Sequence, residues 1–210
     1  MIRDDGRSGS AEFRAAVRST EGLQPWRRLF HMGAGVGIAA FAVVVGPDSP
    51  VPAATLGGAL AAALALDWIR LRSRVANTVF FRWFSALASP REAGKVASST
   101  WYLLGVLAVL VIAPAGWFAS AVLVLALADP AASVVGRLWG RHGLGKGSWE
   151  GTAAFFLVAA AVLAPLAGLQ AALIAAALVA ALEVLPTGID DNLTVPLATV
   201  VALWLVGAPS

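Results

Sequence analysis

The sequence predicts an all-α, polytopic integral membrane protein. Three observations carry this prediction: the share of apolar residues, a series of long apolar segments, and the confinement of basic residues to alternate connections. Of the 210 residues, 59% are hydrophobic and 13% are charged, whereas a soluble domain carries about 25% charged residues. This composition excludes an ordinary soluble globular protein.

About seven transmembrane helices are expected, one for each apolar segment. The segments are residues 29–46, 52–69, 99–113, 116–128, 151–167, 169–185 and 193–206. Several are shorter than the ~20 residues of a straight span, so their ends must extend into polar flanks or the bilayer must thin locally. Very short connections at Pro114-Ala115 and at Gly168 predict antiparallel helix hairpins.

The basic residues orient these segments. With seven crossings, all 15 Lys and Arg fall on one side: six precede the first segment, six lie between the second and third, and three lie between the fourth and fifth. The positive-inside rule places this side and the N-terminus in the cytoplasm. Residues 1–25 are predicted to be a short, partly disordered cytoplasmic tail, and residues 26–210 a single transmembrane domain in the plasma or inner membrane.

The same basicity, with a pI near 10.2, indicates anionic lipid and phosphate as partners rather than nucleic acid. The absence of cysteine excludes disulfides and cysteine-ligated metals. Residues 74–88 repeat apolar side chains every four positions, which predicts a helix lying on the inner leaflet; a loop with incidental aromatics is the alternative. The sequence leaves the oligomeric state open, a homo-oligomer included.

The first candidate site is the segment 126–151, where an apolar span is expected to stop at Asp129-Pro130 and a shorter helix to begin. Asp129 suits an N-cap, but an ionisable group at the end of a span is also a functional candidate. The small residues Ser133 and Gly136 let a backbone or a phosphate approach closely. Arg137 and Lys146, with a flexible glycine-rich loop, predict a phosphate cradle.

The second candidate site is the turn before the last apolar segment. Asp190, Asp191 and Asn192 supply oxygen ligands suited to Mg²⁺, and helix capping by Asp191 or Asn192 is the alternative. Glu183 lies in the preceding span. If Asp129 converges with the Asp190-Asp191 pair, a cation must hold the carboxylates together.

Two further positions are weaker candidates. Asp67 and Arg70 are spaced i and i+3, and a structural ion pair explains them as well as a functional role does. His31 follows Arg27 and Arg28 just inside the first span, where an interfacial or hydrogen-bonded histidine is the commoner case.

Three sequence blocks together resemble a known family. They are D-P-A-A-S-x-x-G-R-x-x-G from Asp129, K-x-S-x-E-G from Lys146, and E-x-L-P-x-G-I-D-D-N-L-T-V-P-L from Glu183. In order and spacing they resemble the CTP-dependent lipid kinases: dolichol kinase, phytol kinase and the CTP-using diacylglycerol kinase. The opening RRLFHMGAG is similar to the family's Arg/Lys-x-x-x-His segment. One departure is Gly147, which separates Lys146 from Ser148, whereas the family usually has Lys followed directly by Ser or Thr.

The resemblance implies a catalytic domain that uses Mg²⁺ and takes CTP as phosphoryl donor to a membrane lipid alcohol, with the active site facing the cytoplasm. Asp129 would be a metal or catalytic carboxylate, and Arg137 and Lys146 would contact the triphosphate. Asp190, Asp191 and Asn192 would form the second half of the nucleotide-metal site, while Ser133 and Gly136 belong to the first block.

Two alternatives stay open. Phosphatidate cytidylyltransferases share the Asp…Gly-Arg…Glu-Gly half of the pattern, but their C-terminal His-Gly-Gly run and terminal Asp-Arg are absent here. Nucleotidyl transfer would be distinguished by its product. The other alternative is an ion-coupled transporter whose broken fourth span and acidic turn bind an ion.

Overall fold

Helices account for nearly all regular structure in this computed structural model, which describes residues 5–22 and 24–209, and the all-α prediction is confirmed. The departure is one short antiparallel hairpin of two strands. The elements in chain order are α1 (Asp5–Arg18), α2 (Pro25–Val45), α3 (Pro50–Arg72), α4 (Arg74–Trp83), η1 (Pro90–Gly94), α5 (Ser98–Ile112), α6 (Ala115–Leu123), η2 (Val124–Ala128), α7 (Asp129–Trp139), β1 (Gly143–Leu144), β2 (Gly147–Ser148), α8 (Trp149–Ala167), α9 (Leu169–Glu183) and α10 (Asp191–Leu205).

Within the described residues, four helical stretches are long and apolar enough to cross a membrane: Pro25–Val45, Pro50–Arg72, Ala115–Trp139 and Trp149–Ala167. Three shorter apolar helices, α5, α9 and α10, pack among them. The outward faces are apolar, with Val44 85% and Trp204 71% exposed. An apolar surface of this extent is not stable in water. These helices therefore indicate a membrane-embedded protein.

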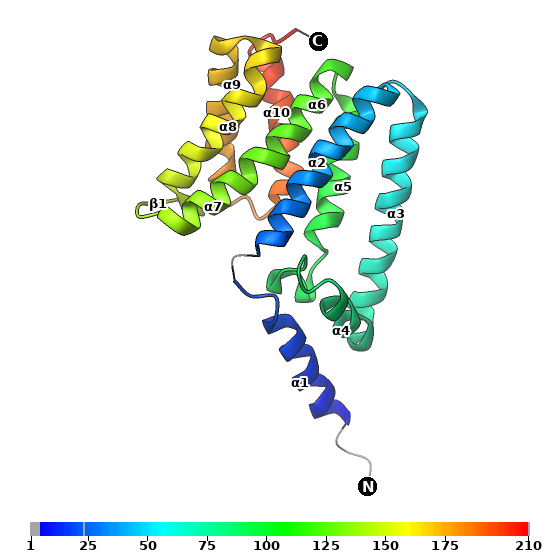
Figure 1. Cartoon of the computed structure of the whole chain (residues 1–210). Helices are drawn as coiled ribbons and strands as arrows, with labels where there is room; N and C mark the ends of the chain where they lie inside the picture. Colours follow the sequence, from blue (N-terminus) through cyan, green and yellow to red (C-terminus); the bar gives the residue numbers. More distant parts are fainter. Residues whose placement is uncertain (1–4, 23, 210) are drawn as a thin grey trace.

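The helices form a bundle around the stretch 115–139 (Figure 1). Helix α2 crosses this stretch on one side, and α8 packs against it on another. Helices α8, α9 and α10 pack in sequence, α10 contacts α5, and α5 contacts α3 at the far edge. The connections α2–α3, α5–α6 and α8–α9 lie at one end of the bundle, whereas α1, α4 and the hairpin lie toward the other (Figure 1).

The N-terminal tail contains more structure than predicted. Residues 1–4 and 23 lie outside the described residues, whereas Asp5–Arg18 form the helix α1. The ring of Phe13 packs edge-on against Phe81 of α4, with centroids 6.1 Å apart. This contact gives α1 an apolar face to bury and attaches it to the end of the bundle.

Helix α4 has the two faces expected of an interfacial helix. Val75 is 75% and Trp83 83% exposed, whereas Phe81 is buried. The helix ends at Trp83, earlier than the predicted 88. Its outward apolar face suits the inner leaflet predicted for it.

The predicted break at Asp129 is wrong, because α6, η2 and α7 run continuously from Ala115 to Trp139. Asp129 has helical backbone angles, φ −63° and ψ −49°, so it is not an N-cap. Pro130 cannot donate the usual helical hydrogen bond. The π-helical turn of η2 ends at Ala128, two residues before Pro130, and such a wider turn accommodates the missing donor without breaking the helix.

Two glycines allow helices to meet at backbone distance. A Cβ on Gly35 of α2 would overlap the Tyr102 hydroxyl and Ala126, and a Cβ on Gly105 of α5 would overlap the carbonyl oxygen of Asn192. Small residues at helix crossings are the usual means of close packing in membranes. They bring α2, α5, η2 and the start of α10 together around one region.

A buried ion pair joins α3 to the segment before α5. Arg70 Nε lies 2.5 Å from Asp67 Oδ1, and Asp67 Oδ2 accepts a hydrogen bond from Thr100 Oγ1 at 2.6 Å. Arg70 also donates to the carbonyl oxygens of Glu92 (2.8 Å) and Lys95 (2.6 Å). The structural ion pair, one of the two alternatives for these residues, is therefore present, and it fixes the η1 segment that lines the site described below.

We expect Asp67→Asn to destabilise the protein strongly, because it leaves the buried Arg70 guanidinium without its counter-charge, a loss that costs about 3 kcal/mol or more. For a chain of this size, the unfolding temperature in detergent should fall by about 10 °C. Glu12→Gln is the matched control, since the Arg82–Glu12 pair is more than half exposed and should be worth less than about 1 kcal/mol. Equal unfolding temperatures for both variants would contradict this assignment.

Candidate functional site

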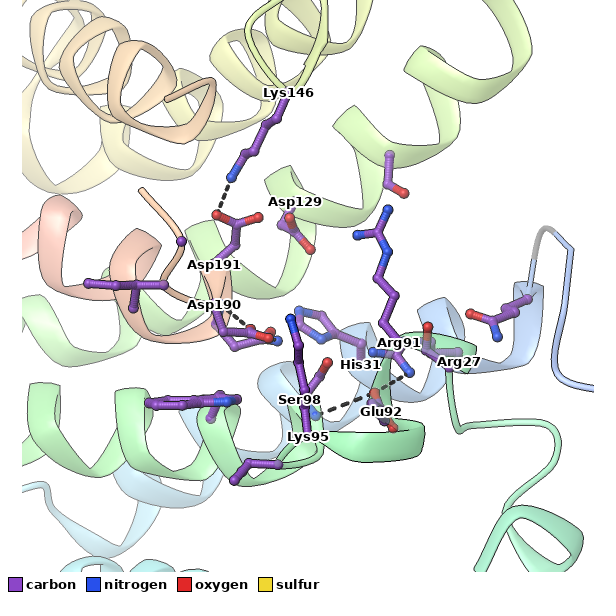
Figure 2. Close-up of a pocket in the computed structure, with 18 of the residues that line it drawn as sticks. Arg27, His31, Arg91, Glu92, Lys95, Ser98, Asp129, Lys146, Asp190 and Asp191 are labelled. Carbon is purple, nitrogen blue, oxygen red and sulfur yellow. Dashed lines mark hydrogen bonds and ion pairs between the residues drawn. The ribbon is translucent and has the colours of Figure 1, made fainter. Parts of the chain in front are cut away.

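A polar cleft opens at the end of the bundle where α2 begins, α7 passes and α10 begins (Figure 2). Its volume is about 1030 Å³, and a second cavity of about 460 Å³ adjoins it between α7 and the hairpin. Asp129, Arg137, Lys146 and Asp191 line both cavities. The two cavities therefore form one site with these residues at the junction.

Three carboxylates from three different helices meet at this junction. Asp129 of α7, Glu183 at the end of α9 and Asp191 at the start of α10 each offer an oxygen, and these atoms lie within 4.8 Å of one another. The predicted convergence of Asp129 with the turn before the last span is confirmed. Glu183 was not predicted as a ligand, although it opens the sequence block that contains Asp191.

Asp190 does not join this group, because it caps α10. Its Oδ1 accepts hydrogen bonds from the backbone N–H of Asn192 at 3.1 Å and from Asn192 Nδ2 at 2.7 Å. Capping by Asp191 or Asn192 was the predicted alternative, and the residue before them takes that role. Burial raises the pKa of the Asp190 carboxyl above its usual value. Asp190 and Asn192 both line the larger cavity, so they border the site without contributing to the carboxylate group.

The hairpin of β1 and β2 delivers Lys146 to the carboxylates. The loop predicted to be flexible is ordered: Leu144 pairs with Gly147, and the backbone N–H of Lys146 donates to the Val184 carbonyl at 3.1 Å. Gly145 has φ +53°, and a Cβ there would overlap that carbonyl, so only glycine fits the turn.

The ammonium group of Lys146 is the counter-charge for two of the carboxylates. It hydrogen-bonds Asp191 Oδ1 (Figure 2). It also lies 3.7 Å from Glu183 Oε1. Lys146 therefore neutralises part of the acidic group, while its predicted contact with a triphosphate stays a prediction.

The other residues predicted from the first block lie along one stretch of α7. Arg137 is exposed and lines both cavities, with Nη1 donating to the Gly22 carbonyl at 3.0 Å. Ser133 Oγ accepts a hydrogen bond from Arg28 Nη2 at 3.0 Å. Gly136 faces α8, where a Cβ would stand 3.2 Å from Ser148 Oγ. Of the two approaches expected at Gly136, backbone or phosphate, the structure shows the backbone approach.

Further basic residues on the cleft wall were not predicted as site residues. They are Arg27, Arg28, Arg91 and Lys95, which come from the start of α2 and from the η1 segment. Arg27 is paired with Glu92, 2.7 Å from Nη1 to Oε1. The signal in the sequence was the Arg27-Arg28 doublet and the Arg91-Glu92 pair. A cleft with cations on several sides suits a polyanion such as a triphosphate.

His31 lies inside the same cleft, in the hydrogen-bonded state that was expected more often than catalysis. Its Nε2 lies 3.2 Å from the carbonyl oxygen of Leu125 in η2, and its ring packs edge-on against Tyr102. Glu150 pairs with His142, 2.8 Å from Oε1 to Nδ1, and Ser148 caps α8.

The carboxylate group fits Mg²⁺ in ligand type and nearly in spacing. Magnesium takes oxygen ligands at 2.0–2.1 Å and is commonly held by one or two carboxylates plus substrate phosphates. Ligands of such an ion stand about 4.2 Å apart when opposite and about 2.9 Å apart when adjacent, so oxygens within 4.8 Å of one another must move closer together by side-chain rotation to bind one ion. Asp129, Glu183 and Asp191 are the residues that would hold it.

No model of a known protein family, no curated protein and no solved structure matches the chain. The site must therefore be judged on its own geometry and on the sequence blocks that build it.

We expect Mg²⁺ to stabilise the folded protein, because it relieves the repulsion among the three carboxylates. A ligand present at a hundred times its Kd stabilises by about 2.7 kcal/mol, which should raise the unfolding temperature in detergent by several degrees over that in EDTA. Glu183→Gln should reduce this rise, whereas Glu150→Gln, outside the acidic group, should keep it. A rise of equal size in both variants would place the ion elsewhere.

Proposed function

We propose that this chain is a membrane-embedded kinase that transfers the γ-phosphoryl group of CTP to the hydroxyl of a lipid alcohol. The observation that carries the proposal is the meeting of three carboxylates, Lys146 and Arg137 in one basic cleft at the polar end of an apolar bundle. A phosphoryl-transfer site needs chiefly positioning and charge neutralisation, and these residues supply both.

In the proposed reaction, the alcohol oxygen attacks the γ-phosphorus and forms a new O–P bond. The bond between the γ-phosphorus and the bridging oxygen of the β-phosphate breaks, and CDP leaves with that electron pair. The alcohol proton passes to a carboxylate of the site or to solvent, and the lipid becomes a monophosphate. Arg137 and Lys146 neutralise phosphate charge, and bound Mg²⁺ would add charge neutralisation at the phosphate oxygens.

CTP as the donor, and a lipid alcohol as the acceptor, follow from the resemblance to dolichol, phytol and CTP-using diacylglycerol kinases. Two structural features agree with it. All three blocks of the resemblance, from Asp129, Lys146 and Glu183, border the same pair of cavities, and the helices expose large apolar side chains that suit contact with lipid.

The transporter alternative has lost one of its supports. It depended on a broken fourth span, whereas the helix is continuous through Asp129. Glu183, Asp190 and Asp191 also lie where α9 ends and α10 begins rather than in the middle of a span. Nucleotidyl transfer stays distinct in its product, and the first experiment below separates it from the kinase reaction.

We expect the purified protein in detergent with Mg²⁺ to transfer label from [γ-³²P]CTP, and not from [α-³²P]CTP, to an alcohol among polyprenol, phytol and diacylglycerol. Label from the α-position would indicate nucleotidyl transfer. If neither the α-label nor the γ-label is transferred to any of the three alcohols, both enzyme proposals are wrong.

Asp129→Asn should reduce the γ-transfer by about 100-fold or more, because it removes one charge from the acidic group while keeping the size of the side chain. Asp48→Asn, in the loop between α2 and α3 at the opposite end, is the matched control and should keep wild-type activity. A monodisperse Asp129→Asn protein with wild-type transfer would remove Asp129 from the reaction.

We also propose seven crossings, with the N-terminus and the cleft in the cytoplasm, because all Lys and Arg fall on one side under this arrangement. The chain has no cysteine, so single cysteines can be placed at Gly188 and at Asp48. A membrane-impermeant thiol reagent outside intact cells should label the cysteine at position 48 and not the one at position 188. The reverse pattern would contradict this orientation.

A further inference from the structure

A third cavity, of about 330 Å³, adjoins the cleft and shares lining residues with it. It lies among α2, α3, α4 and α5, and its lining is mostly apolar, including Phe30, Ile38, Leu66, Phe80 and Phe84. The cavity and the larger cleft share His31 and Asn192. Its volume is at the lower end of the range for small-molecule sites, which are typically apolar with a few convergent polar groups.

Two polar atoms in this lining lack partners. Among the described residues, the buried side-chain atoms without a hydrogen-bond partner are the Tyr102 hydroxyl and Asn192 Oδ1, and both residues line the 330 Å³ cavity. Tyr102 is 6% exposed. Buried polar atoms are nearly always satisfied in native structures, so both atoms are candidate contacts for a bound polar group.

The packing of the helices brings these two residues to the same place. Tyr102 and Gly105 lie at i and i+3 on α5, and therefore on one face of that helix. Gly105 lets the Asn192 backbone approach that face, so the start of α10 is held beside Tyr102. Gly35 allows α2 to close over the Tyr102 hydroxyl.

The cavity also reaches the outer surface of the bundle. Phe30, Leu66 and Phe84 line it and are at the same time 58%, 42% and 42% exposed. In a bilayer these three side chains face acyl chains, so an apolar molecule can enter sideways from the membrane without crossing water.

We propose that this cavity binds the acceptor of the reaction, with the lipid hydroxyl held by Tyr102 and Asn192 and the apolar chain lying along Phe30, Leu66 and Phe84. A hydroxyl suits the two partnerless atoms because it donates one hydrogen bond, here to Asn192 Oδ1, and accepts another, here from the Tyr102 hydroxyl. The inference rests on the proposed kinase function, and it makes Tyr102 and Asn192 positioning residues for the acceptor.

The test is photo-cross-linking without nucleotide, which does not depend on catalysis. The probe is hexadecan-1-ol carrying a diazirine on its chain, compared with the same probe as its methyl ether, which cannot donate a hydrogen bond. We expect the alcohol to label residues of the 330 Å³ cavity, unlabelled alcohol to compete, and the ether to label about fivefold less, the effect of losing one hydrogen bond.

Two kinds of variant separate this site from a nonspecific crevice. Tyr102→Phe should lower labelling by both the alcohol and the ether about fivefold, because the oxygen of either probe accepts the hydrogen bond that the tyrosine hydroxyl donates. Ala34→Phe, which fills the cavity, should abolish labelling there, whereas Ala40→Phe, exposed on the same helix, should not. In the kinase assay, Tyr102→Phe should raise the KM for the alcohol and leave the KM for CTP unchanged.

Equal labelling by alcohol and ether in the wild type would overturn the proposal, because water would then satisfy the two atoms. Unchanged labelling in Ala34→Phe would overturn it as well. If the alcohol binds as expected but no phosphate is transferred from CTP, the cavity is a lipid-alcohol site and the kinase proposal alone has failed.

Discussion

Three carboxylate oxygens within 4.8 Å of one another, at the polar end of an apolar bundle, set the strongest constraint on this molecule. Like charges at that distance repel by about 3 kcal/mol for each pair at an effective dielectric constant of about 20. The cost is comparable with a large share of the stability of a domain. The fold therefore has to bring cations to this point, and several of its unusual features do so.

Lys146 is the nearest of these cations, and the β1–β2 hairpin holds its backbone in place. Gly145 adopts a backbone conformation that places Lys146 against the carbonyl of Val184, directly after Glu183. Its one charge is shared between Glu183 and Asp191, so it cannot balance three carboxylates. A divalent ion would complete the balance, and the guanidinium groups on the cleft wall would match the charge of a bound polyphosphate.

The central helix adds a second constraint, because it must carry Asp129 through a bilayer without a break. The π-helical turn before Pro130 keeps the helix continuous, and π-turns of this kind are frequent at functional sites. The same turn provides the Leu125 carbonyl that His31 meets. The carboxylate of Asp129 and the start of α2 are thus placed relative to one widened turn of one helix.

Much of this arrangement could be predicted from the sequence, and the remainder could not for physical reasons. The lengths of the apolar segments and the positions of the basic residues can be read directly from the sequence. The helices and the polar end of the bundle could therefore be predicted. The acidic residues of two distant blocks were expected to meet because both lie where apolar segments end. Glu183 was not predicted to belong to the carboxylate group, because the position of its side chain depends on where α9 ends. That end is set by helix packing and not by a local sequence pattern.

The break expected at Asp129 shows the opposite error. A proline after an acidic residue usually marks a helix start, and no pattern in the sequence reports a π-helical turn. The order of the hairpin was missed for a similar reason: four glycines in a short loop suggest flexibility, whereas the contact of Gly145 with Val184 comes from a segment about 40 residues later. The hydrogen-bond partner that orders such a loop lies outside the loop's own sequence.

The central claim is that Asp129, Glu183 and Asp191 hold one divalent ion together with a nucleotide triphosphate, and electron-nuclear double resonance with Mn²⁺ in place of Mg²⁺ tests it most directly. With CTP present, protein-bound Mn²⁺ should show ³¹P coupling from coordinated phosphate. The affinity for Mn²⁺-CTP should fall in Asp129→Asn and in Glu183→Gln, and should stay at the wild-type value in Asp48→Asn. Bound Mn²⁺ without ³¹P coupling, or equal affinity in all four proteins, would contradict the account.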